Sequence, residues 1–146
     1  MIREGILNPQ INSLLCRVRH TNMLVIADRG FPSWPTVETV DITLTDDIPT
    51  VLQVLEAIRP NFDIAAIYMA KEFEKENSRE VRSRFSRATF GIPVVFEAHG
   101  QLKSRVPNAV GLIRTADTIP YANMILVSGL ANEFTAKARS LQRNLK

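Results

Sequence analysis

The stretch NMLVIAD, residues 22–28, indicates the fold class of the chain. Five consecutive apolar residues, 23–27, include the β-branched Val25 and Ile26, and Asp28 follows them directly. An unbroken apolar run of this kind is typical of a strand that is buried on both faces, in a sheet covered by helices on both sides. Similar runs occur at 63–70, 109–115 and 123–129. The sequence therefore predicts an α/β protein.

Helix signals alternate with these strands. Asn8 and Pro9 are typical of a helix start, and apolar residues then recur at helical spacing over residues 9–19. Further helices are expected at 49–58, 78–88 and 100–106, further strands at 37–44 and 92–98, and a loop at 29–35. This alternation predicts a three-layer α/β/α sandwich with a central, largely parallel or mixed sheet of about six strands. We expect a single domain over residues 1–146, with residues 131–146 as a C-terminal helical extension.

Composition limits the classes of function. The 146 residues carry a net charge of +3, but the basic and acidic residues of 71–87 are interspersed, which is typical of a solvated helix face rather than a nucleic-acid-binding arm. No apolar run reaches the roughly 18 residues of a membrane span, and no signal peptide is visible at the N-terminus. The single cysteine, Cys16, favours a reducing, cytoplasmic setting. We therefore expect neither nucleic acid nor a membrane as a partner.

Motifs for metals and nucleotides are missing from the sequence. There is no phosphate-binding glycine loop, no dinucleotide-binding glycine pattern and no CxxC pair. The two histidines, His20 and His99, lie far apart and lack the spacing of a zinc site. The sequence thus predicts no metal and no cofactor.

His20 has two interpretations from its position alone. It follows the helix expected at 9–19, where a histidine can simply interact with the helix dipole. It can also act as a general acid or base, because imidazoles exchange protons near neutral pH. Asp28, just past the strand at 23–27, is either a turn residue or a carboxylate that binds a ligand hydroxyl at the end of a strand.

The segment around Tyr121 and Asn123 also has two interpretations. Pro120 and Asn123 favour a turn before the strand at 123–129. A phenol and an amide at such a place also supply donors and acceptors that match neighbouring hydroxyl groups. Phe31 and Trp34 in the preceding loop either wall the face of a sugar or pack against the body of the protein.

Several of these motifs together resemble the D-ribose pyranase and L-fucose mutarotase family. They are CRVRH at 16–20, TNMLVIAD at 21–28, VDITLTDDIPTVLQVLEAI at 40–58, the lone His99, and IRTADTIPYANMIL at 113–126. The resemblance covers about residues 3–130 in the same order. The stretch at 40–55 is more similar to the ribose branch than to the fucose branch.

The resemblance implies a cytoplasmic α/β enzyme that interconverts ring forms or anomers of a free sugar without a metal or redox cofactor. It implies homo-oligomers, commonly decamers, with sites near subunit contacts. His20 corresponds to the catalytic histidine of the family. The implied substrate-binding residues are Asp28, His99, Tyr121, Ala122 and Asn123.

Three features depart from the family pattern. Ala116-Asp117 stands where Gly-Glu is usual, Arg29 replaces a small residue after the site aspartate, and the tail beyond about residue 131 is additional. Arg29 is either a solvent-facing residue or a contact that favours an anionic sugar, because a guanidinium binds carboxylate or phosphate with two hydrogen bonds. The altered 116–117 pair leaves a second hypothesis open, a sugar-binding or regulatory oligomer without catalysis.

Overall fold

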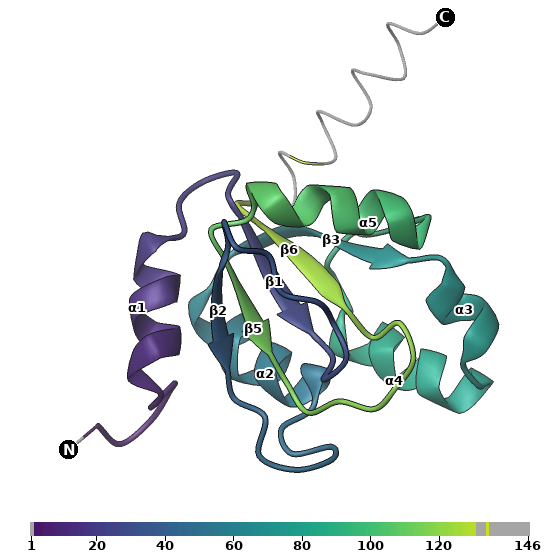
Figure 1. The fold of residues 1–146 in the computed structure, drawn as a ribbon, viewed down its shortest axis with the longest axis horizontal. Coiled ribbons are helices and arrows are strands. Elements are labelled where there is room, and N and C mark those ends of the chain that lie inside the picture. The colour runs from purple at the N-terminus through teal and green to yellow at the C-terminus, as the bar shows by residue number, and fades with distance from the viewer. Residues whose placement is uncertain (1, 131–133, 135–146) are drawn as a thin grey trace, which may run out of the picture.

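A mixed six-stranded sheet forms the centre of the computed structural model, which describes residues 2–130 and residue 134. The strand order is β2-β5-β1-β6-β3-β4, and β6 runs against the other five, which are parallel (Figure 1). The strands are β1 (Met23–Ala27), β2 (Glu38–Asp41), β3 (Ile64–Ala70), β4 (Val94–Glu97), β5 (Gly111–Arg114) and β6 (Met124–Ser128). The prediction of a largely parallel or mixed sheet of about six strands is confirmed.

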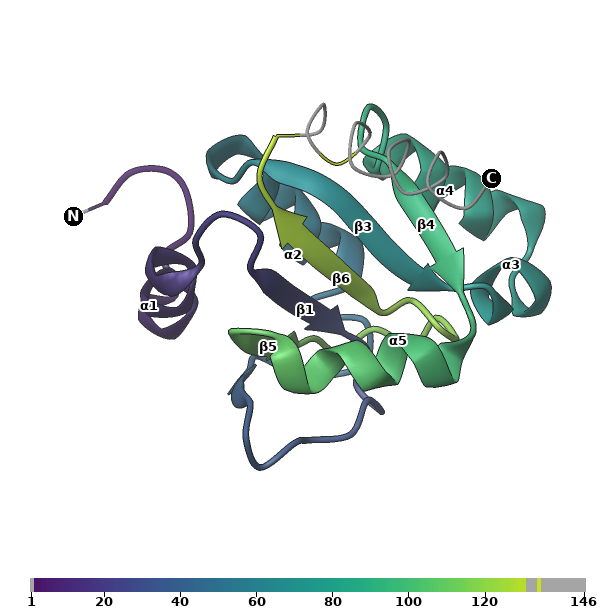
Figure 2. The same cartoon turned by 90° about the horizontal axis from the view of Figure 1, so that it is seen from above.

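Helices cover both faces of this sheet. They are α1 (Pro9–Arg17), α2 (Val51–Ile58), α3 (Glu72–Glu76), α4 (Arg79–Ala88) and α5 (His99–Arg105). Figure 2 shows α5 on one face, with α2 and α4 on the other. Two short 3-10 turns, Arg59–Asn61 and Val106–Asn108, follow α2 and α5. The predicted three-layer sandwich is therefore confirmed.

The helix starts follow from side-chain caps. The Ile11 N–H donates to Asn8 Oδ1 at 2.9 Å, and the Val81 N–H donates to Ser78 Oγ at 3.3 Å. Thr50 and Gln53 cap α2 reciprocally. Because cap residues lie outside the helices they start, α2 and α4 begin slightly later than the expected ranges 49–58 and 78–88.

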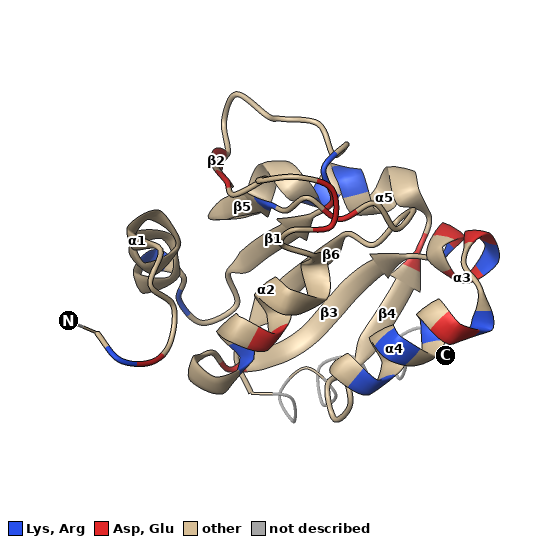
Figure 3. Cartoon of the chain, turned by 90° about the horizontal axis from the view of Figure 1, so that it is seen from below, with Lys and Arg blue, Asp and Glu red and all other residues tan. Residues whose placement is uncertain are grey.

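The segment 71–87, expected as one solvated helix face, contains two helices. Asn77 separates α3 from α4, and its Nδ2 donates to the carbonyl oxygens of Phe73 at 3.0 Å and Pro120 at 2.8 Å. Figure 3 shows basic and acidic residues interspersed along both helices. The start of α4 after the cap Ser78 was expected from the sequence, whereas the short helix α3 before it was not.

The core fills both faces of β1. Leu24 and Ile26 belong to one buried cluster and Val25 and Ala27 to the other, and all four are fully buried. Such burial stabilises the fold by about 1.5–3 kcal/mol for each large aliphatic side chain. The predicted double burial of this strand is confirmed.

The C-terminal helix predicted at 131–143 lies outside the described residues, apart from Phe134. Within residues 2–130, no helix has the length and apolar character needed to cross a bilayer.

Candidate functional site

Four segments meet at one end of the sheet. Parallel pairing brings the carboxyl ends of β1, β3 and β4 to the same edge, and the antiparallel β6 begins there. Asp28 follows β1, Glu72 follows β3, His99 follows β4, and Asn123 precedes β6. The carboxyl ends of strands are where open α/β sheets commonly bind ligands.

A hollow of about 290 Å³ lies at this end of the sheet and is called the strand-end hollow below. It combines carboxylate, imidazole, ammonium, phenol and amide groups with apolar walls. Its lining residues are Asp28, Gly30, Phe31, Pro32, His99, Lys103, Pro120, Tyr121 and Asn123. The structure therefore brings together four of the predicted site residues: Asp28, His99, Tyr121 and Asn123.

Asp28 and Asn123 hold each other by two hydrogen bonds. The Asp28 N–H donates to Asn123 Oδ1, and Asn123 Nδ2 donates to Asp28 Oδ2, both at 2.8 Å. Asp28 Oδ1 accepts a third hydrogen bond, from the Gly30 N–H at 2.9 Å. Asn123 is 2% exposed, so its main effect is to fix the orientation of the Asp28 carboxylate.

Replacing Asn123 by aspartate is expected to weaken sugar binding about 10–100-fold near neutral pH, the loss associated with a charge-assisted hydrogen bond. The new carboxylate would face Asp28, and two adjacent carboxylates raise the pKa of one of them strongly. Affinity should therefore recover as the pH falls, because a protonated carboxyl again donates to Asp28. Calorimetric titration with D-ribose across pH measures this.

Asn12→Asp is the matched control for that prediction. Asn12 lies on α1 and donates to the Ile6 carbonyl oxygen at 2.6 Å, away from the hollow. The Asn12→Asp variant should leave the affinity for D-ribose unchanged at every pH. Equal loss at acidic and neutral pH in Asn123→Asp would contradict the role assigned to the pair.

The segment before β6 places a phenol in the hollow. Tyr121 has a φ of 58°, an unusual left-handed conformation for a residue with a side chain. Ala122 is fully buried in the core, so only its backbone is available to a ligand. Tyr121 is thus the member of the predicted Tyr-Ala-Asn set whose side chain lies in the hollow with no hydrogen bond to another described residue.

His99 begins α5 and faces Tyr121. Their rings meet edge-on, with centroids 5.1 Å apart. The backbone N–H of His99 donates to both carboxylate oxygens of Glu72, at 3.1 and 3.2 Å. Burial and then the charge of Lys103 lower the pKa of His99, while Glu72 and Asp28 act in the opposite direction. The net lowering favours a neutral imidazole at pH 7.

His20 lies at the other end of β1. Met23 pairs with Val127 and Ile26 with Met124, so Asp28 and Asn123 share one end of this pair of strands. The opposite end carries His20, whose ring lies against Gly129. Five strand residues at about 3.3 Å each separate the two ends by roughly 15 Å. One chain therefore does not bring His20 to the strand-end hollow.

Arg29 is not among the residues that line the hollow, and it pairs with the exposed Asp46. The cation in the lining is instead Lys103, one turn after His99 on α5. Sequence reasoning missed Lys103, although its spacing of four residues from His99 places both on one helix face.

Phe31 forms the apolar wall of the hollow, and its ring is 5.4 Å from that of Trp34. Arg114 holds this loop in place by donating to the Phe31 carbonyl oxygen at 3.1 Å and to Ser33 Oγ at 2.8 Å. Of the two aromatic residues of the loop, Phe31 lines the hollow and Trp34 packs behind it.

Asp117, one of the departures from the family pattern, is buried beneath the site. Its Oδ2 accepts from the Val51 N–H at the start of α2, and its Oδ1 accepts from the Ile119 N–H, both at 2.8 Å. Burial raises the pKa of Asp117, although these two hydrogen bonds oppose the shift. Asp117 thus anchors the segment that leads to Tyr121.

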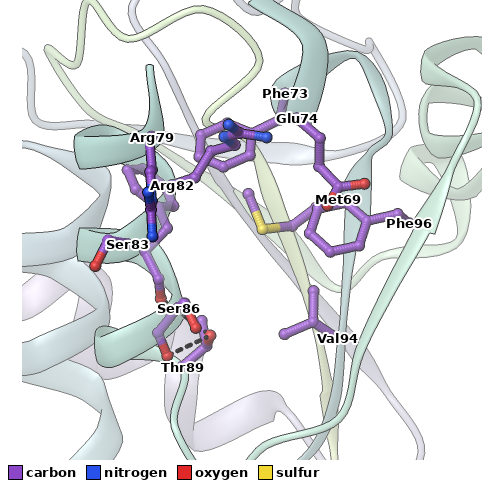
Figure 4. Close-up of a pocket in the computed structure, with 11 residues that line it drawn as sticks. Met69, Phe73, Glu74, Arg79, Arg82, Ser83, Ser86, Thr89, Val94 and Phe96 are labelled. Atoms are coloured by element: carbon purple, nitrogen blue, oxygen red, sulfur yellow. Dashed lines mark hydrogen bonds between the residues drawn. The ribbon is translucent and has the colours of Figure 1, made fainter. Parts of the chain in front are cut away.

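A second hollow, of about 390 Å³, lies between α4 and the β3–β4 edge (Figure 4). Its floor is apolar and includes Met69, Phe73 and Phe96, while Arg79 and Arg82 lie at its rim. It contains no histidine or aspartate, so the strand-end hollow is the better candidate for chemistry. No group of three or more potential metal ligands occurs among the described residues.

Comparisons with known proteins identify the family of the chain. Residues 1–131 match the RbsD / FucU transport protein family. A D-ribose pyranase of Geobacillus kaustophilus is 37% identical over 134 residues, covering 90% of this chain and 96% of the relative. A D-ribose pyranase of a Thermoanaerobacter species is 36% identical over 131 residues, covering 89% and 98%.

Solved structures show the same architecture. Bacillus subtilis RbsD in complex with D-ribose superposes with a TM-score of 0.82 at 27% identity, covering 89% of this chain and 98% of that one. Streptococcus pneumoniae fucose mutarotase in complex with L-fucose has the same fold, with a TM-score of 0.72 at 17% identity and coverages of 85% and 94%. By its sequence over residues 1–131, the chain belongs to the RbsD / FucU transport protein family.

Proposed function

We propose that this protein is a sugar-ring isomerase that interconverts the pyranose and furanose forms, or the anomers, of a free monosaccharide, with D-ribose as the preferred substrate. The observation that carries the proposal is the Asp28 carboxylate, fixed by Asn123 in a hollow that also presents an imidazole and a phenol. Such groups match a ring of hydroxyls. The D-ribose pyranase relatives and the ribose complex of B. subtilis RbsD favour ribose over fucose.

The reaction needs an acid and a base but no strong nucleophile. The anomeric hydroxyl loses its proton to Asp28, the bond from C1 to the ring oxygen breaks, and the ring oxygen takes a proton from His20. The open aldehyde then closes through another hydroxyl or on its other face, and the two proton transfers reverse. General acid–base catalysis of this kind contributes about 10²–10⁴-fold.

A second copy of the chain supplies His20 in this proposal. His20 and the strand-end hollow lie at opposite ends of β1 and β6, so a head-to-tail contact brings the His20 end of one copy to the hollow of the next. A head-to-tail contact of this kind generates a ring when its rotation closes. The family resemblance suggests a homo-decamer, which light scattering coupled to size exclusion measures directly. We propose a cytoplasmic location, in keeping with the exposed, unpaired thiol of Cys16.

One-dimensional NMR of D-ribose tests the function. Saturation of a furanose signal should transfer to the pyranose signals faster when catalytic amounts of the protein are present. The same assay with L-fucose, D-galactose and D-ribose 5-phosphate ranks the substrates. Exchange rates equal to those in buffer, for every sugar, would contradict the proposal.

Lys103→Met is expected to weaken ribose binding about tenfold, because it removes a charged hydrogen-bond donor from the hollow. The loss should be larger for ribose 5-phosphate. Arg29→Met removes the same charge from a neighbouring position outside the hollow and should leave both affinities unchanged. Calorimetry with the two sugars measures this. A loss confined to Arg29→Met would instead support recognition of an anionic sugar by Arg29.

The separation of His20 from the hollow also favours a second candidate, an oligomer that binds sugar without catalysis. Within one chain, the proposed binding groups line the hollow, whereas the proposed acid, His20, lies at the other end of β1. Saturable ribose binding by calorimetry, with no acceleration of ring exchange, would select this alternative.

A further inference from the structure

The ring of His99 is enclosed on one side only. Its Nδ1 is buried and has no hydrogen-bond partner among the described residues. The ring stands edge-on to Tyr121 and also to Phe31, whose centroid is 6.4 Å away. Nε2 is not enclosed in this way, and His99 lines the strand-end hollow. Nε2 is therefore the ring nitrogen that a bound sugar can reach.

The position of the proton follows from this enclosure. A neutral imidazole carries one proton, on either Nδ1 or Nε2. Buried N–H groups without an acceptor are rarer in proteins than buried acceptors without a donor. The enclosed Nδ1 is therefore expected to be the nitrogen without the proton. We propose that His99 is a neutral imidazole protonated at Nε2, and that it donates a hydrogen bond to a sugar oxygen without accepting a proton from it.

The charges around His99 support this assignment. Lys103 faces it from the same helix, Glu72 from the end of β3 and Asp28 from the end of β1. Burial and Lys103 outweigh the two carboxylates, so the net direction of the pKa shift is downward and the imidazolium is disfavoured. An imidazolium would also place a second N–H at the enclosed Nδ1, where no acceptor is available among the described residues.

The catalytic role of the His99 Nε2–H rests on the proposed function. The anomeric oxygen carries negative charge as its proton passes to Asp28, and this charge moves to the ring oxygen as the C1–ring oxygen bond breaks. In ring closure, negative charge develops again on the carbonyl oxygen as a hydroxyl adds to C1. A fixed Nε2–H of His99 stabilises that oxygen, as preorganised donors do in other enzymes. The anomeric proton goes to Asp28 and the ring oxygen receives its proton from His20, so no proton enters or leaves His99. The two histidines therefore have different roles.

Long-range ¹H–¹⁵N spectra of the uniformly labelled full chain test the proton position directly. The chain has only two histidines, so the His20→Gln variant assigns both sets of signals. We expect the His99 ring to show the Nε2-protonated pattern at pH 7. A pattern with the proton on Nδ1, or an imidazolium at pH 7, would overturn the inference.

Two amides test the functional consequence. Glutamine can place a side-chain N–H near the position of Nε2, whereas asparagine reaches only to that of Nδ1. His99→Gln should keep ribose exchange within about tenfold of the native rate, and His99→Asn should lose about 100-fold, the cost of an absent preorganised donor. Equal losses would contradict donation from Nε2. If the native protein fails to accelerate exchange, the proposed function fails while the spectra still decide the position of the proton.

Discussion

Replacing His20 by alanine is expected to slow ring exchange of D-ribose by about 10²–10⁴-fold, the range associated with loss of a general acid. Sugar binding should weaken far less, because the groups that surround the sugar line a hollow at the other end of β1. The side chain of His20 is exposed in one chain, so the variant should fold normally. NMR exchange measures the rate, calorimetry the affinity, and thermal unfolding the stability.

Mixing two inactive variants distinguishes one-chain from two-chain sites. His20→Ala keeps an intact hollow, and Asp28→Asn keeps an intact His20. If His20 acts on the hollow of another copy, the two variants should regain activity when they are unfolded and refolded together. Refolding each one alone is the control. Activity that stays absent in the mixture would place His20 and Asp28 in the same copy, contrary to the proposal.

Replacing Asp117 by alanine should lower the free energy of unfolding by about 2–4 kcal/mol, because one buried and one partly buried N–H donor lose their acceptor. These donors are Val51 at the start of α2 and Ile119 before the site segment. A loss of this size corresponds to a melting temperature roughly 10 °C lower for a domain of this length. Denaturant unfolding at one fixed protein concentration measures it, because oligomers gain stability with concentration.

Asp46→Ala is the matched control for that loss. Asp46 is an exposed carboxylate, and its pairing with Arg29 is a surface ion pair, typically contributing about 1 kcal/mol or less. If the two alanine variants had similar stabilities, the anchoring role of Asp117 would be wrong.

The pH dependence gives Asp117 a second test. Because burial raises its pKa in the folded state, folded protein binds this proton more readily than unfolded protein does. The resulting stabilisation is present below the ordinary value of about 3.9 and is lost as the pH rises through the folded-state value. Relative to Asp117→Asn, which cannot titrate, the native protein should therefore lose stability as the pH rises above about 4. Parallel stability curves for the two proteins would contradict the shift.

Sequence patterns predicted the fold well where local physics decides it. Continuous apolar runs identified the strands buried on both faces, and Asn8, Pro9 and Ser78 marked helix starts through caps that the structure contains. The short helix α3 was not predicted, and the hydrogen bond from Asn77 to Pro120, 43 residues away, has no local signal in the sequence.

The site was predictable only in part. Asp28, His99, Tyr121 and Asn123 do meet, because four strand ends converge. That Asn123 binds Asp28 depends on antiparallel pairing that no sequence period reveals. Lys103 was missed because lysines on exposed helices are common. Arg29 was considered as a sugar contact because it follows Asp28, but its partner is Asp46 in another loop, which its position in the sequence does not reveal.

The direction of β6 has a consequence for how the active centre can change over evolution. This strand begins directly after Asn123, which lines the strand-end hollow, and ends at Ser128, just before Gly129, against which the His20 ring lies. The length of β6 therefore sets the distance between the strand-end hollow and the His20 end of the sheet. Inserting or deleting one residue in it would reverse the faces of its side chains and displace one end relative to the other. The positions of the hollow-lining groups and of His20 therefore cannot change independently, although these groups are proposed to meet only between two copies of the chain.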